Sequence, residues 1–185
     1  MEQDDRTVVR LNLGCGFLPK IGFINVDAFE ICKPDVVHDL NVFPYPWDDN
    51  SVDLIELWHV LEHLEDWWAV FRECTRILKV GGVLDIHVPD ESSTTAGTYR
   101  DHLHIFSQVS FHGILDRTGF GTNAWAAMED ETVPMRQIKY KQAPLKEYNW
   151  MLRWPFRWLL LFCSRHMRNF IWEQQFAFQK IGEMK

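Results

Sequence analysis

The chain has 185 residues, a formal net charge of −7 and hydrophobic residues at 46% of its positions. This length suits one domain with a buried core, and the acidic balance argues against a nucleic-acid-binding protein. The first residues are acidic and polar, so we expect neither a signal peptide nor a membrane-spanning segment.

The cysteines are far apart in the chain and form no C-x-x-C pair. They are Cys15, Cys32, Cys74 and Cys163. This distribution predicts reduced thiols in a cytoplasmic protein, rather than a disulfide framework or a zinc knuckle.

Short apolar runs predict the first four strands, at residues 8–16, 22–27, 35–40 and 51–60. The first run stops at glycines, which indicates a buried strand that enters a tight turn. The second contains Asp27 at its end, and Asp39 lies at the end of the third.

Helical periodicity follows. Asp66 suits an N-cap, and the apolar face after it consists of Trp67, Val70, Phe71, Cys74, Ile77 and Leu78. We expect "KVGG" at 79–82 to end this helix, with Gly81 in the left-handed terminal position. A fifth strand is predicted over 83–90, and a second helix from Ser107 to Gly119.

The segment 147–170 is basic and aromatic, whereas the chain before it is strongly acidic. Its tryptophans and arginines are Trp150, Trp154, Trp158, Arg153, Arg157, Arg165 and Arg168. With Pro155 near its start, the segment predicts a helix, and residues 171–181 predict a final strand. We consider three roles for this helix. It could complete the cover of the sheet, it could bind an anionic membrane or a lipid-linked acceptor through residues 150–168, or its arginines could bind an acidic substrate or partner.

Strands that alternate with helices indicate an α/β domain with a mainly parallel sheet. In such sheets ligands bind beyond the carboxyl ends of the strands. Each of those ends carries a glycine, an acidic residue or an imidazole, and the residues there are Gly14, Cys15, Gly16, Asp27, Asp39, Trp58, His59 and Asp90. The sequence therefore predicts a ligand crevice at this edge of the sheet.

The glycine turn does not fit a dinucleotide-binding fingerprint. Pro19 stands where the third glycine belongs, and Asp27 follows the turn too early in the chain. This disfavours a nicotinamide or nucleotide-sugar enzyme. Glycines at this turn let a ligand approach the backbone closely, and an aspartate at a strand end suits a vicinal diol.

A competing motif is His59-x-x-Glu62-His63, the layout of an inverted zinc-peptidase motif. On a helix this spacing would place two imidazoles one turn apart beside a carboxyl group. However, His59 is expected at a strand end, so we interpret the spacing as coincidental. A zinc-dependent hydrolase stays as the weaker alternative.

The ordered set of motifs resembles the class I S-adenosylmethionine-dependent methyltransferases of the type 11-like group. The motifs are "LNLGCG", "INVD", "VVHDLN", the run from Trp47 to Leu64, "RILKVGGVLDIHVPD" and "HLHIFSQVSFHGILDRTGF". The resemblance covers about Val8 to Phe120 and implies a Rossmann-like three-layer sandwich. It implies one domain, 1–185, with a cofactor-binding core at 8–120 and C-terminal strands and the basic aromatic helix at 121–185.

The resemblance also implies S-adenosylmethionine as the cofactor and a role for each strand end. Gly14, Cys15 and Gly16 would wrap its methionine part, and Asp27 would bind the ribose hydroxyls. Asp39 and the Leu40 backbone would meet the adenine, and Trp58 and His59 would lie beneath the sulfonium. The stretch 17–23 is too short for the usual first crossover helix, which we expect to be shortened or missing.

The expected reaction is methyl transfer to a small-molecule or a glycan- or lipid-linked acceptor. A hydroxyl acceptor needs a base near the methyl group, and histidine titrates in the right range. The candidates are His59, His63, His102 and His104. A non-catalytic S-adenosylmethionine-binding module is the alternative of a different class, and self-association into a homo-oligomer is a further hypothesis.

Overall fold

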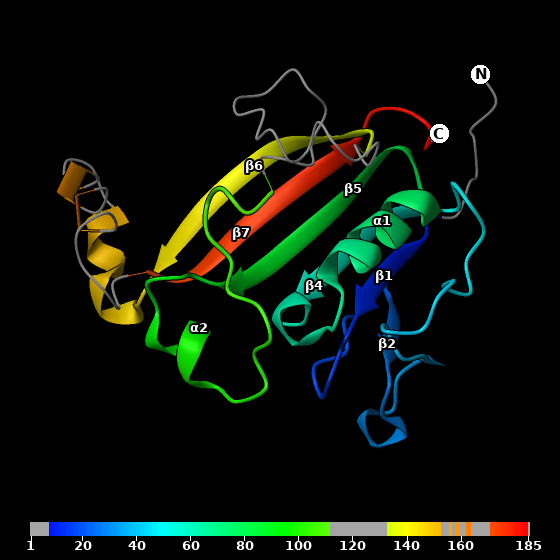
Figure 1. Ribbon diagram of the computed structural model, residues 1–185, viewed down its shortest axis with the longest axis horizontal. Helices are drawn as coiled ribbons and strands as arrows, with labels where there is room; N and C mark the ends of the chain where they lie inside the picture. The colour runs from blue at the N-terminus through cyan, green and yellow to red at the C-terminus, as the bar shows by residue number, and fades with distance from the viewer. Residues whose placement is uncertain are drawn as a thin grey trace.

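In the computed structural model, seven strands form one sheet in the order β3-β2-β1-β4-β5-β7-β6 (Figure 1). The structure describes residues 8–111, 133–152, 156, 158–159, 162–163 and 171–184. The strands are Arg10–Leu13 (β1), Ile24–Asp27 (β2), Val36–Val37 (β3), Val52–Trp58 (β4), Leu78–Pro89 (β5), Met135–Pro144 (β6) and Ile171–Lys180 (β7). The helices are Trp67–Ile77 (α1) and Thr94–Thr98 (α2), with 3-10 turns Glu30–Cys32 (η1), Leu61–His63 (η2) and Lys146–Leu152 (η3).

Strands β1 to β5 are all parallel to one another, and β7 is antiparallel to both β5 and β6. The predicted α/β class, the mainly parallel sheet and the final strand are confirmed. The edge strand β6 was not predicted, because its charged and polar residues alternate only weakly with apolar ones.

The connection between β1 and β2 is made of turns, without a helix, as the short spacing predicts. Only η1 stands between β2 and β3. The loops at these strand ends are therefore short and remain close to the sheet.

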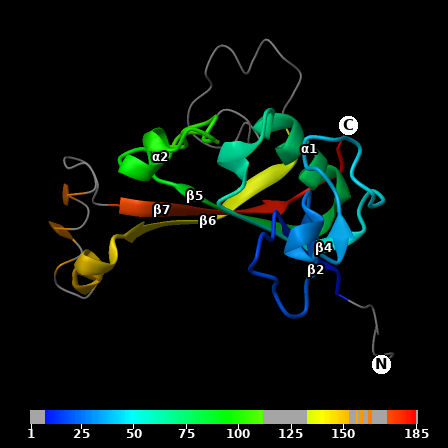
Figure 2. The ribbon, with the colours of Figure 1, turned by 90° about the horizontal axis from the view of Figure 1, so that it is seen from below.

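The two described helices lie on the same side of the sheet (Figure 2). On β5, Leu84, Ile86 and Val88 are buried in the core cluster that also contains Phe71 of α1. Asp85 and His87 alternate with them and are only partly buried. The third layer of the expected sandwich is therefore not seen in the described part of the chain.

Polar pairs occupy the strand positions that point away from α1. Between β5 and β7, Gln175 Nε2 donates to Asp85 Oδ1 at 2.9 Å, and His87 Nδ1 lies 2.9 Å from Glu173 Oε1. Such polar residues suit a sheet face that is exposed to solvent, while the opposite face packs on the apolar core. This explains how the sheet tolerates the missing crossover helices.

Helix α1 begins as predicted, since Asp66 accepts a hydrogen bond from Ala69 N at 2.9 Å. Its predicted end was wrong. The helix stops at Ile77, and Leu78 is already extended at φ −66° and ψ 138°, so Gly81 lies inside β5. Gly81 does adopt a positive φ of 90° there.

Two predicted helices are tested only in part. Residues 107–111 form turns, and the rest of the stretch to Gly119 lies outside the described residues. Most of 147–170 also lies outside them, although its start belongs to η3. Within the described part, no helix is long and apolar enough to cross a membrane.

Candidate functional site

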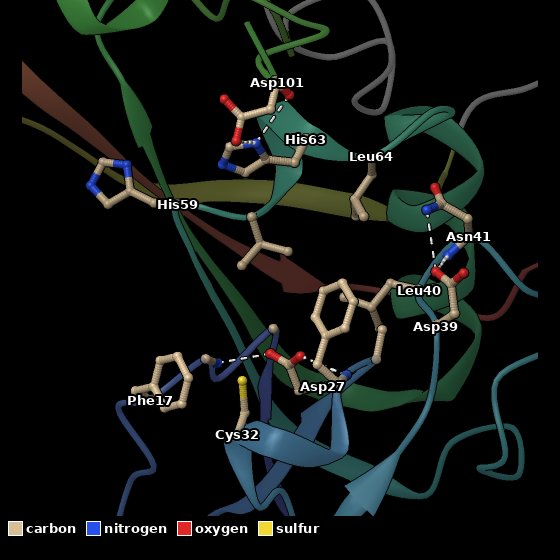
Figure 3. A pocket seen from close by; sticks show the side chains of 15 residues that line it. Phe17, Asp27, Cys32, Asp39, Leu40, Asn41, His59, His63, Leu64 and Asp101 are labelled. Carbon is tan, nitrogen blue, oxygen red and sulfur yellow. Dashed lines mark hydrogen bonds and ion pairs between the residues drawn. The ribbon is translucent and has the colours of Figure 1, made fainter. Parts of the chain in front are cut away.

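A pocket of about 530 Å³ lies at the carboxyl ends of β1, β2 and β4. Its volume is within the usual range for small-molecule sites. Figure 3 shows Asp27 and Cys32 at one end of the pocket, and His63 and Asp101 at the opposite end. The predicted crevice at the strand ends is therefore present.

The glycine turn after β1 forms one wall of this pocket. Gly14 and Gly16 both have positive φ angles, of 68° and 50°. A Cβ on Gly14 would lie 2.5 Å from Val60 Cγ2, whereas a Cβ on Gly16 would meet nothing within 4 Å. Gly14 thus permits close packing against Val60, and Gly16 leaves the pocket open beside it.

Cys15, between these glycines, is buried and is not among the pocket-lining residues. Its backbone N–H donates to Val26 O at 2.9 Å, which ties the turn to β2. Cys15 therefore contributes to the turn through its backbone rather than through its side chain.

Asp27 at the end of β2 organises the turn from the other side. Its Oδ2 accepts from Gly16 N at 2.8 Å, and its Oδ1 accepts from Phe29 N at 3.0 Å. Each carboxylate oxygen can accept a second hydrogen bond, so a vicinal diol in the pocket can donate to this group. The geometry fits the ribose of S-adenosylmethionine.

The third group of predicted cofactor residues lies on the loop after β3. Asp39 Oδ1 accepts from Asn41 N at 2.9 Å, and Leu40 is 5% exposed. Asp39, Leu40 and Asn41 all line the pocket. An apolar side chain beside polar acceptors and donors fits a nucleoside base.

His59 follows β4 and lines the pocket, with a positive φ of 52°. Its Nε2 lies 2.9 Å from Glu173 Oε2, and its Nδ1 lies 3.3 Å from Glu62 Oε1. Burial opposes the charged imidazole, but hydrogen bonds with Glu173 and Glu62 raise the pKa of His59 to about 9. At neutral pH His59 thus already carries a proton, which disfavours it as a base.

Trp58 is not among the pocket-lining residues, although the resemblance implies a place there. Its ring stacks on His87 at 4.7 Å between centroids, and its Nε1 donates to Glu173 Oε2 at 3.1 Å. Successive side chains of a strand point to opposite faces, and Trp58 is on the polar face together with Glu56. The lining of the pocket thus gives no support to the expected place of Trp58 beneath a sulfonium, which stays a prediction.

The remaining candidate histidines separate into two groups. His63 lines the pocket, whereas His102 and His104 do not and lie on the segment after α2. His104 Nε2 lies 2.9 Å from Leu64 O. The group of potential metal ligands that contains Glu62 and His63 does not include His59, so the H-x-x-E-H spacing does not by itself form a metal site.

Glu173 of β7 joins three side chains of β4, β5 and the turn after β4, and the sequence did not reveal it. It accepts from Trp58 Nε1 and is paired with both His59 and His87 at 2.9 Å. Burial opposes ionisation, yet the hydrogen bonds with His59 and His87 lower the pKa of Glu173 to about 2. Glu173 is not itself among the pocket-lining residues. The lining residues that the sequence did not predict are Phe17, Ala28, Phe29, Cys32, Asn41, Val60, Leu64 and Asp101.

Comparison with known proteins agrees with this geometry. A family model described as a methyltransferase domain matches residues 24–86. Demethylmenaquinone methyltransferase of Bacillus mycoides (strain KBAB4) is 24% identical over 130 residues, which are 68% of this chain and 54% of that protein. The chain thus spans about half the length of this curated relative.

Solved structures share the fold at low sequence identity. An S-adenosylmethionine-dependent methyltransferase from Archaeoglobus fulgidus has a TM-score of 0.58 and 15% identity, with 94% of this chain and 86% of that chain covered. The [4+2]-cyclase SpnF also has a TM-score of 0.58, with 13% identity and coverage of 94% and 74%. These structures support the fold, and their reactions are not the same.

Proposed function

We propose that this chain is a class I S-adenosylmethionine-dependent methyltransferase, a proposal that its fold and its match to a methyltransferase family model over residues 24–86 support. The observation that carries the proposal is the meeting of three strand ends at one pocket, with Gly16, Asp27 and Leu40 in its lining. Residues 8–120 are the proposed cofactor-binding core of the domain.

The protein contributes alignment to such a reaction. S-adenosylmethionine, when bound, supplies a methyl group on a positively charged sulfur. Asp27 would accept hydrogen bonds from its ribose while the same carboxylate holds the Gly16 N–H, which couples ligand position to the glycine turn. Leu40 and Asn41 would confine its base.

The acceptor side of the pocket is proposed to lie toward His63 and Asp101. Phe17 and Phe29 line the other end of the pocket, beside Asp27 (Figure 3), and are 73% and 68% exposed, so the opening of the pocket also has an apolar part. A small molecule or a glycan- or lipid-linked acceptor suits this opening. The role of His63, His102 or His104 in taking a proton from the acceptor stays a prediction.

Calorimetry with S-adenosylmethionine and its demethylated product tests the cofactor assignment. We expect Asp27→Ala to weaken the binding of both ligands at least tenfold, about 1.4 kcal/mol. The variant loses the carboxylate that would accept hydrogen bonds from the ligand and that also accepts one from Gly16 N. The matched control is Asp35→Ala. Asp35 also accepts from backbone, at Asn25 N, but is not among the pocket-lining residues.

The outcome that contradicts the proposal is a wild-type protein that binds neither ligand at millimolar concentration. Equal weakening by Asp27→Ala and Asp35→Ala would instead locate the loss in general stability. The rival function is a non-catalytic binding module, and a fold shared with a cyclase keeps that rival open. Transfer of a labelled methyl group to any acceptor would exclude it.

We also propose that the segment 150–168 contacts an anionic membrane surface or a lipid-linked acceptor. Trp150 and Trp158 are 47% and 66% exposed, and tryptophan suits the membrane interface. We expect the protein to co-sediment with anionic vesicles at low salt and not with neutral ones. No sedimentation with either would contradict this, and a purely cytoplasmic location would then be the simpler expectation.

A further inference from the structure

Three potential metal-ligating side chains converge at the end of the pocket where the acceptor is proposed to bind. One carboxyl oxygen of Glu62 and one ring nitrogen each of His63 and His102 lie within 4.8 Å of one another. His63 itself lines the pocket, so the cluster adjoins its rim.

In both histidines of this cluster, Nδ1 is engaged by a backbone carbonyl oxygen. His63 Nδ1 lies 3.1 Å from Asp101 O, and His102 Nδ1 lies 3.2 Å from Ala96 O. A carbonyl oxygen only accepts, so each Nδ1 carries the hydrogen and each Nε2 is left with a lone pair. Metal-bound histidines characteristically donate their other ring N–H to such an acceptor.

Glu62 provides an independent indication. Its side chain is 1% exposed, and Oε2 is buried without a hydrogen-bond partner in the part of the chain that the structure describes. Leaving a buried acceptor unsatisfied costs about 1–3 kcal/mol. A cation at this oxygen would remove that cost, while Oε1 keeps its contact with His59 Nδ1.

Backbone hydrogen bonds hold the two halves of the cluster together. Glu62 O accepts from Leu103 N at 2.8 Å and from His104 N at 3.2 Å. The segment that carries His102 is thereby fixed against η2, although about 40 residues separate them in sequence. The arrangement is therefore a property of the fold rather than of mobile side chains.

We propose that Glu62, His63 and His102 bind a divalent transition-metal ion, with Zn²⁺ as the best match to two imidazoles and one carboxyl oxygen. Ligand atoms about 2.1 Å from zinc lie roughly 3.4 Å apart in a tetrahedral site, so modest side-chain rotation closes the cluster. Three protein ligands leave a fourth position for water or for an acceptor atom. The site stands independently of methyl transfer.

The test is titration of the full chain with Zn²⁺ after treatment with a chelator. We expect one ion per chain with micromolar or tighter affinity, and Co²⁺ should give the visible absorption of a nitrogen- and oxygen-ligated ion. Glu62→Gln and His102→Ala should each weaken Zn²⁺ binding at least tenfold. The control is His104→Ala, since His104 Nε2 is already engaged by Leu64 O.

Binding of the demethylated cofactor to each variant serves as the check on folding. A variant that binds this ligand normally and has lost Zn²⁺ supports the site, even if no methyl transfer is ever found. The proposal is overturned if the wild type takes up no stoichiometric Zn²⁺, or if both ligand variants bind it as tightly as the wild type. In that case the edge-on ring contact of His63 and His102, 4.8 Å between centroids, is simply packing.

Discussion

Gly14→Ala is expected to lower the free energy of unfolding by about 3 kcal/mol, because two costs add at this position. The φ of 68° costs an alanine roughly 1–2 kcal/mol. The new Cβ would also stand 2.5 Å from Val60 Cγ2, and overpacking of this kind costs about 1–3 kcal/mol. Urea denaturation of wild type and variant measures the sum.

The matched control for this prediction is Gly22→Ala. Gly22 has a φ of 81°, but nothing lies within 4 Å of an added Cβ, so only the backbone cost applies. We expect a loss of about 1–2 kcal/mol there. The double variant Gly14→Ala/Val60→Ala should show a favourable coupling energy, since the shortened Val60 makes room. Equal losses for the two glycine variants would show that the Val60 contact is not a cost.

The strand ends were the most predictable part of the site. Parallel strands place their carboxyl ends at one edge of a sheet, so the residues that follow Leu13, Val26 and Val37 had to be neighbours. Local sequence therefore sufficed for Gly16, Asp27 and Asp39, which the structure brings to one pocket.

The polar face of β5 could be predicted from the sequence. The sequence "LDIHVPD" alternates apolar and polar residues, which is typical of a strand with one solvated face. A strand covered by helices on both faces is a nearly continuous apolar run. Asp85 and His87 thus indicate that the face of β5 that points away from α1 is polar.

Long-range partners were not predictable from local patterns. Strand β7 runs antiparallel beside β5, and His87 is paired there with Gln175. Glu173, two residues before Gln175 on the same face of β7, therefore comes close to His87 and His59. The partners of Trp58 on the polar face were not predictable for the same reason, since they come from β5 and β7. Sheet order, rather than spacing along the chain, determines these contacts.

The second large effect is expected at Glu173, whose pKa of about 2 is well below the ordinary 4.5. Burial opposes its ionisation, and the hydrogen bonds with His59 and His87 more than offset this. Because the folded-state pKa is depressed, the stabilisation is present above pH 4.5 and is lost as pH falls toward 2. A shift of this size corresponds to about 3 kcal/mol.

Glu173→Gln should therefore lower the free energy of unfolding by about 2–3 kcal/mol at neutral pH. The difference should shrink as pH falls from 4.5 toward 2, because wild-type Glu173 then loses its charge as well. Denaturant unfolding at several pH values measures this difference directly, since the other carboxyl groups titrate in both proteins. Glu30→Gln, the same chemical change at an exposed residue of η1, is the control.

The pH course of the difference distinguishes charge from packing. If the variant is destabilised by the same amount at pH 7 and pH 3, the loss arises from the shape of the amide and the ion-pair interpretation is wrong. If the difference disappears in acid, the charge of Glu173 is what holds β7 to His59 at the end of β4. That result would mean that the pocket wall formed by His59 depends on a strand 114 residues further along the chain.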